Sequence, residues 1–148
     1  MPFPPVLTRM SGRVPAVEVY FSALPAGTAS VTVWRIAAGR EMRVRGAVKA
    51  ATAGQLTRVD YEVPFGVPVA YRAECFNSSG VRLSYTDQAT VTVAVAGLWV
   101  HNPLDPQGAV ACDFRDRALE KIQAPNDGSL LRVPGQRAGV FLAGTQQG

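Results

Sequence analysis

The chain has 148 residues, of which 47% are hydrophobic and 18% charged, and its formal net charge is +4. This composition supports a buried core and excludes a chain that is disordered throughout. The N-terminus lacks the basic start and apolar run of a signal peptide, and no window is long and apolar enough to cross a membrane. We therefore expect a cytoplasmically synthesised chain without a membrane span.

Residues 1–13 are rich in proline and are interpreted as an extended arm that becomes ordered against a neighbour. After the arm, apolar and polar residues alternate with the period of two that is typical of half-buried strands. Turns rich in glycine and proline separate these segments. The pattern predicts strands at 16–24, 30–36, 42–50, 56–63, 69–76 and 81–95.

The segment 77–80, NSSG, allows two interpretations. Asn77 fits the acceptor pattern for N-glycosylation, which would indicate a secreted glycoprotein. The same residues tolerate turn conformations and stand between two predicted strands. Because the chain has no signal peptide, we interpret NSSG as a hairpin turn.

About six strands with turn signals between them predict an all-β protein, a β-sandwich over residues 14–95. The expected core is formed by the apolar side of each alternating segment. It comprises Val17, Val19, Phe21, Val31, Val33, Val59, Tyr61, Tyr71, Ala73, Cys75, Val91 and Val93.

The segments VEVYFSALPAG, VTVWR and VDYEVPFGVPVAYRAECFNSSGVRLSYTDQATVTV together resemble a fibronectin type III module, an immunoglobulin-like sandwich. In this resemblance Phe21 stands where the family usually has a core tryptophan. Tyr71 stands where the family has its corner tyrosine. The likeness covers roughly residues 14–95 and implies a fold rather than a chemistry.

Residues 96–148 differ in sequence pattern from the preceding strands and are expected to form a junction and a small second β-unit. Trp99 and the prolines of NPLDP suit a linker that docks onto this unit. Residues 114–125 are the one stretch with helical propensity, and Pro125 would end a helix there. Short strands are predicted at 129–133 and 138–142. So small a unit would hardly be stable alone.

A fibronectin-like module followed by WVHNPLDPQGAV resembles the minor tail proteins of long-tailed bacteriophages, particularly those of high-GC actinobacterial hosts. The preference for arginine over lysine agrees with such a source. The resemblance implies a virion location and a structural role near the tail tip or baseplate. The expected partners are other copies in a ring or trimer and other tail proteins. The expected contact residues are Phe3, Trp34, Trp99, His101 and Leu104.

The alternative function is a carbohydrate-binding module for a host-surface glycan. β-Sandwich proteins present exposed aromatic side chains on which sugars stack. The alternation places Tyr20, Trp34, Phe76 and Tyr85 on outward faces. The same aromatic side chains would also suit subunit contacts, because Trp and Tyr are enriched at interfaces. The sequence does not separate these two roles.

Other chemistry has little support in the sequence. His101 is the single histidine, no serine lies in a G-x-S-x-G context, and there is no glycine-rich phosphate loop. We therefore expect no enzyme, no cofactor and no metal. Arginines at 40, 43 and 45 are interpreted as a solvated face rather than a nucleic-acid site. A disulfide between Cys75 and Cys112 is one alternative, and two reduced, buried cysteines are the expectation.

Overall fold

The computed structural model describes residues 3–102, 104–112, 128–131 and 140–143. The chain divides into two compact units, Met1–Cys112 and Asp113–Gly148, so the division falls later than the one expected after residue 95. The described residues form strands and turns without a helix, which confirms the all-β class. None of them forms a helix that could cross a membrane. The helix expected at 114–125 lies outside the described residues.

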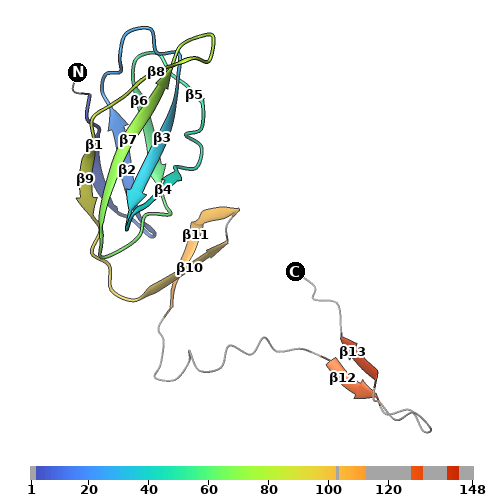
Figure 1. Cartoon of the computed structure of the whole chain (residues 1–148). Coiled ribbons are helices and arrows are strands. Elements are labelled where there is room, and N and C mark those ends of the chain that lie inside the picture. Colours follow the sequence, from blue (N-terminus) through green and yellow to red (C-terminus); the bar gives the residue numbers. More distant parts are fainter. Residues whose placement is uncertain (1–2, 103, 113–127, 132–139, 144–148) are drawn as a thin grey trace. The chain divides into compact units, whose positions relative to one another are not determined.

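The sandwich of the first unit consists of two antiparallel sheets (Figure 1). One sheet has three strands in the order β1-β2-β6: β1 (Val6–Ser11), β2 (Pro15–Phe21) and β6 (Leu56–Asp60). The other is built on β3 (Ser30–Ala37) and β7 (Pro68–Phe76), with β4 (Arg40–Arg43) and β8 (Arg82–Tyr85) on either side. The short β5 (Ala50–Ala51) also pairs with β3, and β9 (Ala89–Thr92) pairs with β7.

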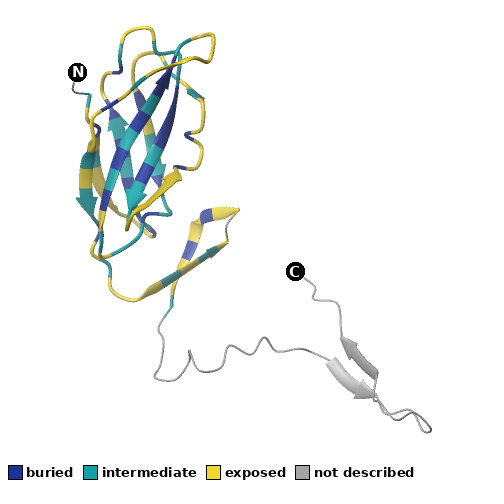
Figure 2. Cartoon of the chain, viewed as in Figure 1, coloured by how far each residue is buried: buried dark blue, intermediate teal, exposed yellow. Residues whose placement is uncertain are grey.

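The hydrophobic core lies between the two sheets, as expected for a β-sandwich (Figure 2). Side chains from β2 and β3 alternate between this interior and the outside, which is the pattern that the sequence predicted. Nine expected core residues are buried: Val17, Val19, Phe21, Val31, Val33, Tyr71, Ala73, Cys75 and Val93. Val91 is partly buried and packs against the same cluster.

The facing of β6 differs from the prediction. Val59 and Tyr61 were expected in the core, but both are only partly buried and belong to no core cluster. Directly opposite residues of an antiparallel pair share a face. Asp60 lies opposite Val17, and Leu56 lies opposite Phe21, so these two residues point inward instead. The alternation was misleading because the inward residue at the end of β6 is a carboxylate.

The proline-rich arm is also different from the expected one. Val6–Ser11 is not a free segment but strand β1, and it pairs with β2 along its whole length, from Val6 opposite Tyr20 to Ser11 opposite Pro15. The backbone of about half of the arm is therefore already hydrogen-bonded to the chain's own sheet. Among the described residues of the arm, 3–5 precede the strand and 12–13 follow it.

The predicted strand at 42–50 is mostly a loop. After β4 ends at Arg43, the chain turns back toward β3. Two residues of this loop, Val44 and Ala47, are fully buried. The amide of Val44 donates to the carbonyl of Val33 (2.9 Å), and the amide of Val33 donates to the carbonyl of Ala47 (2.8 Å). Gly46 (φ 70°) permits this reversal because it adopts the left-handed region.

The hairpin turn at 77–80 is confirmed. The side-chain oxygen of Asn77 accepts hydrogen bonds from the amides of Ser79 (3.0 Å) and Val81 (2.9 Å). The amide of Asn77 donates to the carbonyl of Val81 at 3.0 Å. Asn77 thus closes the turn with its own side chain, which is a common role of asparagine in turns.

Two further hairpins follow the sandwich. The segment expected to be a linker contains a hairpin of β10 (Leu98–Asn102) and β11 (Asp105–Cys112). In the second unit, β12 (Gly128–Leu131) and β13 (Val140–Ala143) pair antiparallel, within two residues of the strands predicted there. No disulfide joins the two cysteines: Cys75 is buried as expected, but Cys112 is partly exposed, which corrects the expectation that both are buried.

Candidate functional site

Two of the predicted site residues, Trp34 and Tyr85, lie on the same outer face of the β4-β3-β7-β8 sheet. Trp34 on β3 is opposite Arg72 on β7, and Tyr85 on β8 is opposite Glu74 on β7. The alternation along β3 and β7 turns these side chains away from the core. We call this surface the arginine–aromatic face; it comprises Trp34, Glu41, Arg43, Arg72, Glu74, Arg82 and Tyr85.

The aromatic rings of this face are paired with arginines of the same chain. The guanidinium carbon of Arg72 lies 4.3 Å from the ring centroid of Tyr85, and that of Arg82 lies at 5.5 Å. The guanidinium carbon of Arg43 lies 5.4 Å from the ring of Trp34. All three distances are within the range of cation–π attraction. The part of each ring that an arginine covers is not open for stacking on a ligand.

Two glutamates complete the arginine–aromatic face. The indole nitrogen of Trp34 donates to Glu74 at 3.0 Å, and Arg72 donates to Glu41 at 2.9 Å. Arg82 lies 3.9 Å from Glu74. These partly exposed ion pairs contribute little stability each, but together they restrict the orientation of the two aromatic rings. The charged and aromatic side chains of this face therefore contact one another.

The other two predicted glycan contacts do not join Trp34 and Tyr85. Phe76 is only 8% exposed, and the amine of Lys49 lies 2.9 Å from its ring centroid, so a sugar could not stack on it. The Lys49 side chain, which also approaches the carbonyl of Gly80 at 3.5 Å, covers the ring of Phe76. Tyr20 lies on β2, in the opposite sheet, where its hydroxyl donates to Gln55 at 3.3 Å. The four predicted contacts therefore do not form one site.

Phe3 and Tyr85, predicted for different roles, line one pocket. Its volume is about 580 Å³, and its wall is completed by Leu24, Pro25, Ala26 and Ser84. The lining is mostly apolar, with the hydroxyl groups of Ser84 and Tyr85 as its polar side-chain groups. Tyr85 belongs both to this pocket and to the arginine–aromatic face, so a ligand in the pocket would lie beside that face.

The predicted contact residues of the junction lie on β10 and at the turn that follows. Trp99 and His101 share one face of β10 and are partly buried. The indole nitrogen of Trp99 is buried without a hydrogen-bond partner among the described residues. His101 Nδ1 lies 3.1 Å from the carbonyl of Asn102. Leu104, at the turn, is 87% exposed. Trp99 and His101 are therefore near one another, and far in sequence from Trp34 on β3.

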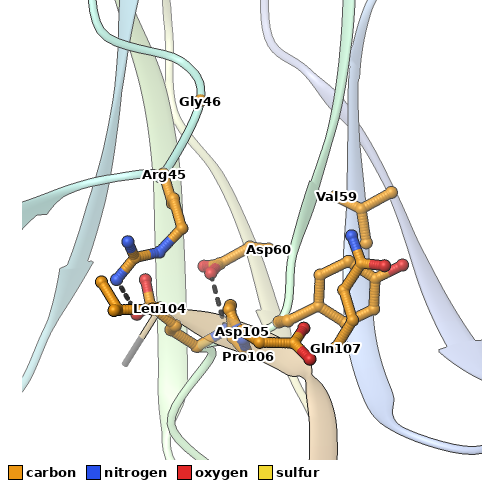
Figure 3. A pocket seen from close by; sticks show the side chains of 10 residues that line it. Arg45, Gly46, Val59, Asp60, Leu104, Asp105, Pro106 and Gln107 are labelled. Atoms are coloured by element: carbon orange, nitrogen blue, oxygen red, sulfur yellow. Dashed lines mark hydrogen bonds and ion pairs between the residues drawn. The ribbon is translucent and has the colours of Figure 1, made fainter. Parts of the chain in front are cut away.

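Within the first unit, a pocket of about 360 Å³ is lined by residues 45–46, 59–62 and 104–107 (Figure 3). Three of its four charged side chains, Arg45, Asp60 and Glu62, have hydrogen-bond partners. Arg45 donates to Glu62 at 2.8 Å, and the carboxylate of Asp60 accepts from the amide of Glu62 at 3.0 Å. Among the described residues, no group of three or more metal-ligating side chains forms.

A buried polar network, which sequence reasoning missed, joins the two sheets. Arg35 on β3 donates to both oxygens of Asp60 on β6, at 2.7 and 2.9 Å, and the hydroxyl of Tyr71 on β7 donates to Asp60 at 2.8 Å. Arg35 and Asp60 are only 4% and 2% exposed. The signal was present in the sequence, because Arg35 continues the inward phase of Val31 and Val33 and so needs a buried partner.

This network predicts an alkaline loss of stability. Burial raises the pKa of Tyr71 above its usual value near 10, and the adjacent Asp60 carboxylate raises it further. The unfolded chain therefore ionises this phenol at a lower pH than the folded chain does. The raised pKa of Tyr71 therefore contributes fully to the free energy of unfolding below about pH 10, and this contribution is lost as the pH rises further.

We expect the free energy of unfolding of the wild-type chain to fall between pH 10 and 11.5 by up to about 1.4 kcal/mol per pH unit more than that of Tyr71→Phe. Denaturant unfolding curves at a series of pH values measure this difference. The other three tyrosines are common to both proteins and cancel. Parallel pH profiles of the two proteins would contradict the role assigned to Tyr71.

Comparisons with known proteins supply no relative. A scan against protein-family models, a search of curated proteins and a search of solved structures each find no match to this chain. The function proposed next therefore rests on the residues and their geometry.

Proposed function

We propose that this chain is a structural subunit of a bacteriophage tail, from the tail tip or baseplate region. A fibronectin type III-like sandwich provides a rigid surface, and the segment after it joins neighbouring subunits. The observation that carries the proposal is the hairpin β10–β11, which exposes Leu98, Val100, Leu104 and Val110. Clustered apolar side chains on a protein surface are typical of sites of association.

The interior of the sandwich supports a structural role. Asp60 accepts hydrogen bonds from Arg35, Tyr71 and the amide of Glu62, so one carboxylate ties β3, β6 and β7 together. Because this network is buried, each bond is stronger than it would be in water. A sandwich whose sheets are joined in this way suits the role of a rigid assembly subunit.

The N-terminal segment has a smaller part in the proposal than the sequence indicated. Since Val6–Ser11 is a strand of the sheet, only the residues before it are available as an arm. Phe3 still lies beside the pocket at Tyr85. The short N-terminal segment and the hairpin are therefore the two regions that we assign to contacts with neighbouring tail proteins.

The test is the presence of the chain in virions. Phage particles from a lysate of cells infected by the phage that encodes the chain would be purified on a density gradient and probed with a gold-labelled antibody against the sandwich. We expect label at one position on the tail, and the chain in mass spectra of the particles. A chain found only in the soluble fraction of the lysate, with unlabelled particles, would overturn the proposal. An antibody against a known capsid protein serves as the control for particle integrity.

The alternative is a carbohydrate-binding module, and one observation favours it: Tyr85 and Trp34 share a face, beside the pocket that Phe3 and Ser84 line. Tyr20 provides a matched control, since it lies on the opposite sheet. Under the assembly proposal we expect no saturable binding to a panel of bacterial surface glycans, measured by calorimetry. Binding that Tyr85→Ala weakens at least about tenfold and Tyr20→Ala leaves unchanged would instead establish the alternative.

A further inference from the structure

The pocket beside the arginine–aromatic face has the lining of a ligand site. Its volume of about 580 Å³ falls within the range of about 300–1,000 Å³ that is typical of ligand pockets. Among the described residues that line it, none is charged, and the hydroxyl groups of Ser84 and Tyr85 are its polar side-chain groups. Two of its walls, Phe3 and Tyr85, are aromatic. Such a lining favours a ligand with an apolar, flat body.

A β-bulge places a cation next to this pocket. Arg82 and Tyr85 are three positions apart, so in a regular strand their side chains would lie on opposite faces. The bulge in β8 leaves Leu83 without a partner on β7, and Arg82 therefore lies beside Tyr85. Nη1 of Arg82 is 3.5 Å from the hydroxyl oxygen of Tyr85, and the guanidinium carbon is 5.5 Å from the ring centroid. Bulges commonly re-aim side chains next to functional sites.

The ion pair of Arg82 is the loosest among the described residues. Three other ion pairs join atoms 2.7–2.9 Å apart, whereas Arg82 lies 3.9 Å from Glu74. A separation of 3.9 Å is too long for a hydrogen bond. The other carboxylate oxygen of Glu74 accepts from the indole of Trp34 at 3.0 Å. The side chain of Arg82 is 59% exposed, so its guanidinium can bind an anion from solution.

We propose that this pocket binds a small aromatic carboxylate. The ring of the ligand lies in the apolar pocket against Phe3 and Tyr85, and its carboxylate accepts hydrogen bonds from Arg82. The planar fork of a guanidinium matches a carboxylate in geometry as well as in charge. Because so small a ligand makes few contacts, we expect a dissociation constant on the order of 1 mM or below. The proposal goes beyond the tail assignment and does not rest on it.

The first test compares two probes of the same shape, naphthoate and its neutral amide, naphthamide, by calorimetry on the full chain at low salt. We expect naphthoate to bind at least about fivefold more tightly, because only the carboxylate forms a charge-assisted pair with an arginine. Equal affinities for the two probes would overturn the proposal. The absence of saturable naphthoate binding up to about 10 mM would overturn it as well.

A charge-removing variant identifies the arginine. Arg82→Gln should lower the affinity for naphthoate to that for naphthamide and leave naphthamide binding unchanged. Arg45→Gln is the matched control: the Arg45 side chain is 52% exposed, it also pairs with a glutamate, and it lines a different pocket. We expect this control to change naphthoate binding by less than about twofold. Equal losses in both variants would indicate a general attraction to a basic protein, which contradicts the proposal.

A space-filling variant locates the ring of the ligand. Ala26 lines the pocket and is exposed, so Ala26→Trp should fill the pocket without disturbing the core and abolish the binding of both probes. Ala23→Trp is its control, because Ala23 is exposed on the same loop and does not line the pocket. In amide NMR spectra of the wild-type chain, naphthoate should shift the signals of Ala26, Ser84 and Tyr85. Shifts confined to the hairpin β10–β11 would show that the probe binds exposed apolar side chains there, and the proposal would fail.

Discussion

Replacing Asp60 by alanine is expected to lower the free energy of unfolding by about 3–5 kcal/mol. The substitution leaves the guanidinium of Arg35, 4% exposed, without its partner at 2.7 Å, and it frees the hydroxyl of Tyr71. An uncompensated buried charge is among the largest single penalties in a protein interior. Since small domains are stable by about 5–15 kcal/mol, the variant should lose a large fraction of its stability. Urea unfolding followed by tryptophan fluorescence measures the change.

A second variant separates the cost of an unpaired charge from the net value of the network. Replacing Arg35, Asp60 and Tyr71 together by Met, Leu and Phe removes every polar group and leaves none unpaired. We expect this triple variant to be more stable than Asp60→Ala, within about 2 kcal/mol of the wild type. If it were as unstable as Asp60→Ala, the penalty would arise from lost packing, and the electrostatic explanation would be wrong.

Replacing Phe21 by alanine is expected to cost about 3–5 kcal/mol. Phe21 is fully buried at the end of β2, opposite Leu56, and is one of the two largest fully buried side chains. Truncation removes most of its apolar surface and leaves a cavity that two hydrogen-bonded sheets cannot collapse to fill. Thermal and urea unfolding would both report the loss.

The effect should depend on the volume removed. Phe21→Leu, which keeps most of the volume, is expected to cost about 1–2 kcal/mol. Val81→Ala, at a position 60% exposed, should change stability by less than about 0.5 kcal/mol. A Phe21→Ala loss no greater than that of Val81→Ala would show that Phe21 does not lie in the core.

The candidate site was only partly predictable. Alternation placed Trp34 outside and Val33 inside, because a strand with one clearly apolar side has one stable orientation. It also placed Phe76 outside, which is the correct side of β7. Lys49, which covers Phe76, follows a chain reversal at Gly46, where alternation predicted a continuous strand. Burial by a loop depends on where the loop packs, and local periodicity does not report that.

The neighbours of Trp34 and Tyr85 on adjacent strands likewise depend on the register in which the strands pair. The sequence indicated exposed Trp34 and Tyr85, but not that Arg72 and Glu74 would lie between them. Those neighbours follow from the pairing of β3 with β7 and of β7 with β8. The bulge between Cys75 and Phe76 shifts this second register, so counting along the chain would misplace Arg82.

By itself, the sequence determined the all-β class, the positions of most strands, the turn at Asn77 and the core contributed by β2, β3 and β7. These features follow from local chemistry: period-two alternation, turn residues and apolar side chains that must leave water. The tertiary structure alone decided that β6 turns Asp60 inward, that the arm becomes strand β1, and that residues 98–112 form a hairpin with an exposed apolar face. Each depends on a partner distant in the sequence, such as Arg35 for Asp60, and such partners are set only when the sheets pair and pack.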